Sequence, residues 1–157
     1  MEPLMEIVSD DEAHNVWLLL VQTRDALFNA RQKELDKYHL SIGRASMLFA
    51  ITSLGDGVIP AQLSPWVFRK PNTVWEIIKR MEKDGLVTTR KDTERKNLVR
   101  VSLTKKGEEL YRLASKRKSI HRIMSSLSQE ELQLLKSCLK KLRDGAIKEL
   151  ETVNKKS

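Results

Sequence analysis

Basic side chains are concentrated in one stretch of the chain, residues 69–106. This stretch holds twelve Lys and Arg residues against five Asp and Glu residues, so it carries +7 of the formal net charge of +8. Concentrated positive charge is typical of proteins that bind a polyanion such as nucleic acid. A basic surface that only aids solubility would have the same composition, so the spacing of the residues has to separate the two interpretations.

The first part of this stretch has the spacing of an amphipathic helix at about residues 71–84. Pro71 suits the first helical turn, and Val74, Ile78 and Met81 fall on one face. The opposite face is polar, and there an Asn can pair with adenine while a Thr methyl can contact thymine. The candidate DNA-binding residues of this helix and its approach are Arg69, Lys70, Asn72, Thr73, Trp75, Glu76, Lys79 and Arg80.

Several of these side chains also have a purely structural interpretation. Trp75 could pack against its own domain, and Glu76 could pair with Arg80 four residues later on the helix. Lys79 could be an ordinary solvent-facing charge. Trp75 could also anchor a contact with another protein, which makes a winged-helix protein-interaction module the alternative function.

The second part of the stretch, RKDTERKNLVRVSL at residues 90–103, changes from charged residues to an alternating pattern. Val99, Val101 and Leu103 alternate with polar residues, which is the period of a half-buried β-strand. Together with the charged residues before it, this strand predicts a hairpin with a basic tip, a wing at about residues 90–100. Its candidate DNA contacts are Lys91, Arg95 and Lys96.

Helical patterns precede these two features. A capping-box pattern with Ser9 as the N-cap predicts a long helix at about residues 11–37. Ser41 can cap a second helix, and Pro60 suits the first turn of a short third one. Short helix, turn, helix and hairpin follow one another as in a winged helix. The expected fold class is therefore mainly α with a small β-hairpin wing.

Long helices are expected on both sides of the winged helix. The run Val16–Val21 is apolar on all faces, whereas a surface helix of a small monomer should show only a stripe. One helix is predicted at residues 105–124, and a capping box at Ser128 opens the last helix. The apolar stripe of that last helix runs for about six turns, which is more than this chain can cover by itself.

Two segments resemble the MarR family of winged-helix regulators: TVWEIIKRMEKDGLV at Thr73–Val87 and TERKNLVRVSLTKKGEEL at Thr93–Leu110. The resemblance covers about residues 12–150. It implies a homodimer that binds double-stranded DNA and reads a pseudo-palindromic site, most often as a repressor. The recognition helix would then enter the major groove, and the wing would contact the minor groove.

The resemblance also implies an organisation along the chain and one departure from the family. The implied parts are an N-terminal dimerisation helix at 1–38, a winged helix-turn-helix region at 39–104 and C-terminal dimerisation helices at 105–157. Family members usually carry an Asp-x-Arg pattern in the wing. Asp92, Glu94 and Arg95 do not have that spacing, so the sequence leaves open which arginine reaches the minor groove.

Many members of the family release DNA when a small, often aromatic, effector binds. The resemblance implies a pocket with the candidate lining residues Trp17, Leu20, Met47 and Phe49, although these residues could equally be ordinary core. Cys138, the one cysteine, falls on the apolar stripe of the last helix. It is expected to be buried and unreactive rather than an oxidant sensor.

Other functional classes find no support in the sequence. His14, His39 and His121 are scattered, so neither a metal site nor a cofactor is predicted. No Gly-rich phosphate loop or nucleophile motif is present, so the chain is not expected to be an enzyme. The acidic N-terminus lacks the pattern of a signal peptide, and no apolar run reaches the ~18 residues of a membrane span. The expected location is the cytoplasm.

Overall fold

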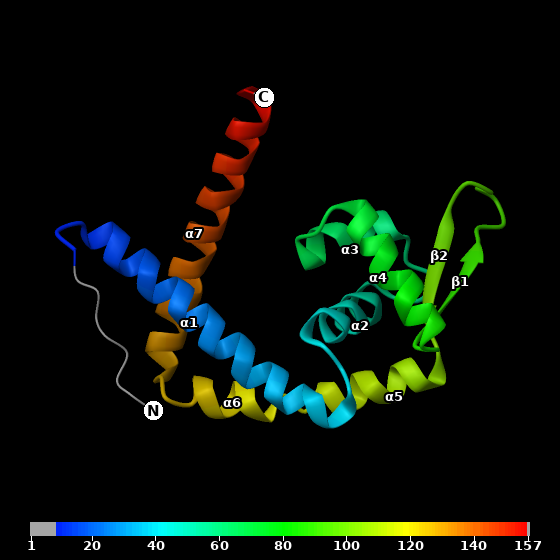
Figure 1. Ribbon diagram of the computed structural model, residues 1–157, viewed down its shortest axis with the longest axis horizontal. Helices are drawn as coiled ribbons and strands as arrows, with labels where there is room; N and C mark the ends of the chain where they lie inside the picture. The colour runs from blue at the N-terminus through cyan, green and yellow to red at the C-terminus, as the bar shows by residue number, and fades with distance from the viewer. Residues whose placement is uncertain (1–8, 157) are drawn as a thin grey trace. The chain divides into compact units, whose positions relative to one another are not determined.

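The computed structural model describes residues 9–156, and the chain divides into two compact units between Arg117 and Lys118 (Figure 1). The first unit contains α1 (Glu12–Leu35), the 3-10 turn η1 (Asp36–Tyr38), α2 (Ile42–Leu54), α3 (Pro60–Val67), α4 (Pro71–Lys83), β1 (Val87–Lys91), β2 (Val99–Leu103) and α5 (Lys105–Ala114). The second unit contains α6 (Lys118–Met124) and α7 (Gln129–Lys156). Helices with a single two-stranded hairpin confirm the predicted fold class.

Residues 1–8 and 157, which belong to the predicted dimerisation segments, lie outside the described residues. Among the described helices, none combines the length and the apolar character needed to cross a membrane.

Side chains at the helix N-termini fix where the main helices begin. The predicted cap of α1 at Ser9 is wrong, because Asp11 is the cap and accepts a hydrogen bond of 3.1 Å from the backbone N–H three residues later. Ser41 caps α2 as predicted. Ser128 and Glu131 form the predicted capping box of α7, in which each side chain accepts from the backbone N–H of the other residue.

The core of the first unit lies where α2, α3, α4 and the hairpin meet. Leu63 of α3, Ile78 of α4 and Val101 of β2 are fully buried. Burying one such side chain stabilises the fold by about 1.5–3 kcal/mol. Val74 and Met81 are also fully buried, which confirms the apolar stripe predicted for α4. The contribution of α2 is Met47, Leu48, Ala50 and Ile51.

The hairpin is attached to the helices through its apolar face. β1 and β2 pair antiparallel, with Val87 opposite Leu103. Val101 is fully buried and Val99 half-buried, which confirms the predicted orientation of this strand. The N–H of Val101 also donates 2.8 Å to the carbonyl of Val58, just before α3. The wing is therefore bonded to the helix-turn-helix as well as packed against it.

The single helix predicted at residues 105–124 is wrong, because the structure forms α5 and α6 instead. α5 ends at Ala114, and the hydroxyl of Ser115 donates 2.7 Å to the carbonyl of Tyr111. Arg117 has φ +48°, a left-handed conformation that the interior of a right-handed helix does not contain. The apolar positions keep a helical spacing across this break, so the sequence pattern did not reveal it.

Large apolar side chains on α1 and α7 are exposed in the single chain. Trp17 and Leu19 of α1 are 61% and 63% exposed, and Leu142 and Leu150 of α7 are 51% and 65% exposed. Cys138 is exposed as well, so the predicted burial of its thiol is wrong for the isolated chain. These helices expose the apolar surface that their sequence pattern predicted.

Candidate nucleic-acid interface

α4 presents one face to the core and the opposite face to solvent. Asn72 and Thr73 in its first turn are exposed, and so are Glu76 and Arg80 further along. Lys70 stands at the N-cap without a side-chain capping bond, so the first-turn N–H groups keep their positive potential. A helix that enters the major groove needs this arrangement, with apolar support behind and hydrogen-bonding groups in front.

Trp75 and its neighbours form a local cluster on the side of α4. The ring of Trp75 is half-buried and packs against the core, and the Nζ of Lys79 lies 5.6 Å from the ring centre. Lys79 also pairs with Glu76 at 3.5 Å, in place of the pairing of Glu76 with Arg80 that the helical spacing allowed. The packing of its ring against the core gives Trp75 a structural role in its own domain, which is one of the interpretations that the sequence allowed.

The turn between α3 and α4 brings two more cations to the start of α4. Arg69 and Lys70 are both exposed there. Phe68, which comes directly before them, has φ +49° and a side chain that is 66% exposed. Sequence analysis did not single out Phe68, since an isolated aromatic residue in a turn carries no pattern.

Asp92 organises the tip of the wing. Its carboxylate accepts hydrogen bonds from the backbone N–H of Arg95 at 2.7 Å and of Glu94 at 2.9 Å, and from the Nε of Arg100 at 2.5 Å. Arg100 in turn donates 2.9 Å to the carbonyl of Gly57. The N–H of Arg95, then the side chain of Arg100 and the N–H of Glu94, lower the pKa of Asp92 from 3.8 to about 2. The carboxylate is therefore ionised at neutral pH and shapes the turn.

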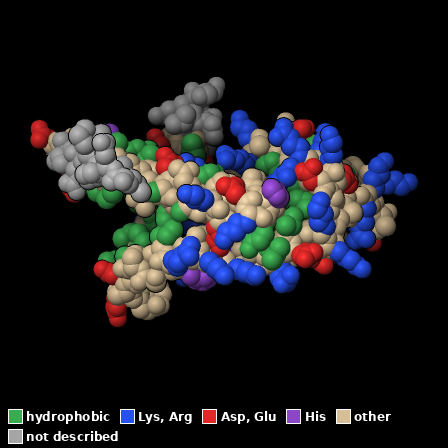
Figure 2. Space-filling model, turned by 60° about the horizontal axis from the view of Figure 1, so that its bottom comes forward, with side chains coloured by type: hydrophobic (Ala, Val, Ile, Leu, Met, Phe, Trp, Pro, Cys, Tyr) green, Lys and Arg blue, Asp and Glu red, His purple; other side chains and the backbone are tan. Residues whose placement is uncertain are grey.

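The basic side chains of the wing tip are directed to solvent rather than to this network. Lys91, Arg95 and Lys96 are exposed, and Arg95 is held by Asp92 only through its backbone. Figure 2 shows Lys and Arg side chains gathered around the part of the first unit that carries the hairpin. The arginine whose side chain pairs with Asp92 is Arg100, eight residues along the chain.

Three contacts tie α4 to the wing and to α2. The carboxylate of Glu82 accepts from the N–H of Thr89 at 2.8 Å and from its hydroxyl at 2.6 Å, so α4 is bonded to β1. Asp84, at the end of α4, forms an ion pair with Arg44 of α2. Sequence analysis missed Glu82, because an exposed Glu on a helix is ordinary. Together these contacts fix α4 and the wing relative to each other.

The candidate effector residues occupy different environments in the first unit. Met47 is fully buried in the core, whereas Trp17 is exposed and Leu20 half-buried. Phe49 is 39% exposed; its ring centre lies 5.9 Å from that of Trp66 and 5.3 Å from the guanidinium of Arg117. The effector pocket therefore stays a prediction, and Met47 is the member with an evident structural role.

Among the described residues, no group of three or more His, Cys, Asp or Glu side chains is placed to hold a metal ion. The exposed thiol of Cys138 lies on α7, where the sequence placed it. Neither the search for metal ligands nor the position of Cys138 indicates a metal-binding or catalytic site among the described residues.

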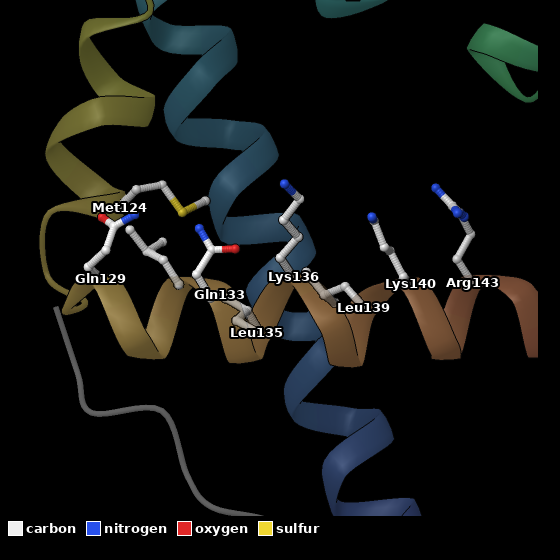
Figure 3. A pocket seen from close by; sticks show the side chains of 9 residues that line it. Met124, Gln129, Gln133, Leu135, Lys136, Leu139, Lys140 and Arg143 are labelled. Atoms are coloured by element: carbon white, nitrogen blue, oxygen red, sulfur yellow. The ribbon is translucent and has the colours of Figure 1, made fainter.

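The second unit carries an open groove of about 660 Å³ along α7, seen from close by in Figure 3. Its floor is apolar and includes Met124 of α6 together with Leu132, Leu135 and Leu139 of α7. Three cations line one side of it: Lys136, Lys140 and Arg143. In Figure 3 these three side chains point to the same side of α7. The groove forms part of the apolar surface that the single chain leaves exposed.

Comparison with known proteins gives matches among solved structures only. No family model matches the chain, and no curated protein matches it. One similar structure is the organohalide-sensing transcriptional regulator RdhR-CbdbA1625, bound to 2,4-dichlorophenol. It shares 28% sequence identity and a TM-score of 0.80, over 92% of this chain and 89% of that chain.

Two more distant structures share the fold. A MarR-family transcriptional regulator from Rhodococcus sp. RHA1 has 18% identity and a TM-score of 0.73, over 85% of this chain and 96% of that chain. A mutant of MarR from E. coli, complexed with operator DNA, has 16% identity and a TM-score of 0.75, over 81% of this chain and 92% of that chain. These neighbours are transcriptional regulators and not enzymes.

Proposed function

We propose that this chain, which has the MarR-type winged-helix fold, is a homodimeric, sequence-specific DNA-binding regulator of transcription. The observation that carries the proposal is the geometry of α4. Val74 and Met81 hold one face of this helix in the core, and Asn72 and Thr73 stand exposed in its first turn. Two structurally similar proteins support the same function: the MarR mutant complexed with operator DNA and the regulator bound to 2,4-dichlorophenol.

In the proposed complex, α4 lies in the major groove. Asn72 pairs with an adenine edge and Thr73 contacts a neighbouring base, while Arg69, Lys70 and Arg80 neutralise phosphates. The uncapped N–H groups of the first turn provide a further phosphate site. Base contacts thus come from the start of the helix and most of the affinity from the cations around it.

The wing contacts the flanking minor groove in this proposal. Asp92 fixes the turn through its bonds to Arg95 N–H and Arg100, which leaves the side chains of Lys91, Arg95 and Lys96 free to reach the DNA. A narrow, A·T-rich minor groove concentrates negative potential and attracts such cations. We assign the minor-groove contact to Arg95, because its side chain is exposed at the tip whereas Arg100 is bonded to Asp92 and Gly57.

A homodimer would cover the apolar surfaces of α1 and α7. Trp17, Leu19, Leu139 and Leu142 are exposed in the single chain, and soluble monomers rarely expose large contiguous apolar patches. A two-fold dimer presents two recognition helices and so reads a pseudo-palindrome, with half-sites about one DNA turn apart.

A small-molecule effector, a repressor role and a cytoplasmic location complete the proposal, and no catalytic step is part of it. The similar regulator bound to 2,4-dichlorophenol supports an effector. Trp17, Leu20 and Phe49 remain its candidate contacts, because each retains exposed surface, whereas Met47 is enclosed in the core.

The test begins with duplexes that the wild-type protein selects from a random pool. Binding to a selected duplex should weaken steeply with salt, because phosphate contacts release counterions. Asn72→Ala should relax base preference at one position per half-site, and Lys96→Ala should weaken binding to all sequences and lower the salt slope by about one. Lys33→Ala, an exposed lysine of α1, is the control and should behave as wild type. Selection of no common sequence would refute the proposal.

A further inference from the structure

Phe68 combines two features that the fold itself does not require. It is the C-cap of α3, with φ +49° and ψ +47°, a left-handed conformation that glycine adopts freely and other residues rarely adopt. Its side chain is 66% exposed, more than any other aromatic side chain among the described residues. A glycine at this position would make the same backbone capping bond to the carbonyl of Ser64. The phenyl ring is thus an addition to a turn that functions structurally without it.

The surroundings of Phe68 indicate what the ring contacts. The exposed cations Arg69 and Lys70 follow it directly, and the exposed Asn72 and Thr73 begin α4. A strained backbone that displays a side chain is characteristic of functional sites. An apolar ring among cations and base-reading side chains fits the major-groove edge of DNA, where the 5-methyl group of thymine is the apolar feature.

We propose that Phe68 is a specificity-determining DNA contact, in which the ring packs against a thymine methyl next to the base pairs read by Asn72 and Thr73. This inference rests on the proposed function. A second copy of the chain fits this surface less well, because a two-fold contact at the turn would bring Arg69 and Lys70 of both copies together, and like charges repel. The apolar faces of α1 and α7 carry no such obstacle.

The experiment compares wild type with Phe68→Gly and Phe68→Leu on a duplex that the wild-type protein selects. Phe68→Gly should melt at the same temperature or higher, because it removes the left-handed strain. It should nevertheless bind the duplex about four- to tenfold more weakly for each half-site, since each protomer loses one buried methyl contact. Phe68→Leu, which keeps an apolar side chain, should lie between the two. Leu54→Ala, which truncates an exposed apolar side chain of α2, is the matched control and should not change binding.

A second arm replaces each thymine of the half-site in turn by deoxyuridine, which removes only the methyl group. At one position the wild type should lose the same four- to tenfold, and Phe68→Gly should be insensitive to the replacement. The inference would be overturned if Phe68→Gly bound the duplex as tightly as wild type, or if it kept the full effect of the deoxyuridine replacement. It would also be overturned if the Phe68→Gly dimer dissociated. Failure of the wild type itself to select a sequence would instead overturn the proposed function.

Discussion

Gly107→Ala should destabilise the protein, although alanine is normally the better residue inside a helix. Gly107 lies in the first turn of α5, where a change to Ala would ordinarily stabilise by about 1 kcal/mol. In this structure a Cβ at Gly107 would overlap the carbonyl oxygen of Leu86 and lie 3.1 Å from its carbonyl carbon. Both are backbone atoms, so no side-chain rotation relieves the overlap.

The magnitude follows from the contacts of Leu86. Forcing an extra methyl group into a packed site costs about 1–3 kcal/mol. The displaced carbonyl also accepts the N–H of Thr104 at 3.1 Å, a bond that contributes about 1 kcal/mol. After the helix-propensity gain is subtracted, we expect a net loss of about 2 kcal/mol. For a chain of this size the loss corresponds to a Tm lower by roughly 4–8 °C.

The assay is thermal and urea unfolding at one fixed protein concentration, because the Tm of the proposed dimer would depend on concentration. Gly43→Ala is the matched control: Gly43 is also in the first turn of a helix, and a Cβ there meets no atom within 4 Å. It should be as stable as wild type or slightly more stable. Leu86 lies between α4 and β1, so Gly107→Ala should also weaken DNA binding at temperatures where it remains folded. If Gly107→Ala were as stable as wild type, the close approach of α5 to Leu86 would be refuted.

Three further predictions concern other parts of the chain. Asp92→Asn should loosen the wing tip and speed amide exchange at Glu94 and Arg95 at neutral pH, whereas the control variant Glu94→Gln should exchange like wild type. In the wild type the pKa of Asp92 is about 2 in the folded protein and ordinarily 3.8. The stabilisation of the wing tip by the Asp92 carboxylate should therefore be complete above pH 4 and be lost as the pH falls toward 2. Equal exchange in Asp92→Asn and wild type would contradict this role. Met47→Ala should lower the free energy of unfolding by about 2–5 kcal/mol in urea titrations, because it empties a fully buried core position, and a loss below about 1 kcal/mol would contradict its core role. Leu139→Glu should shift the chain from dimer to monomer in sedimentation experiments, whereas Ser137→Glu on another face of α7 should not; a Leu139→Glu variant that stays dimeric would exclude the α7 groove from the interface.

Much of the winged helix could be predicted because its signals are local. The buried stripe of α4 follows from helical spacing, and the burial of Val101 from strand alternation. The end of α4 also has a local signal, because a glycine after a helical pattern is a typical cap: Gly85 has φ +73°, and the N–H of Leu86 donates to the carbonyl of Met81.

The features that sequence reasoning missed depend on contacts between separate elements. Asp92 and Arg100 are eight residues apart and meet only because the hairpin folds back. Glu82 reaches Thr89 across the turn after α4, and nothing in its helical spacing marks it. The separation of α5 from α6 depends on the conformation of Arg117, which the continuous apolar pattern conceals.

The exposure of α1 and α7 illustrates a different limit. The apolar pattern of both helices was evident in the sequence, but the expected burial of Cys138 assumed a partner that the single chain does not supply. A pattern indicates that a face is to be covered, and only a structure of the assembly identifies what covers it.

Hydroxyl-radical footprinting of the wild-type protein on a selected duplex tests whether a dimer binds DNA through α4 and the wing. Two equivalent protected segments are expected about one DNA turn apart, with additional protection of the flanking minor grooves. The flanking protection should disappear in Arg95→Ala while the central segments remain. A single unpaired footprint, or flanking protection that persists in Arg95→Ala, would contradict a dimer that reads DNA with α4 and the wing.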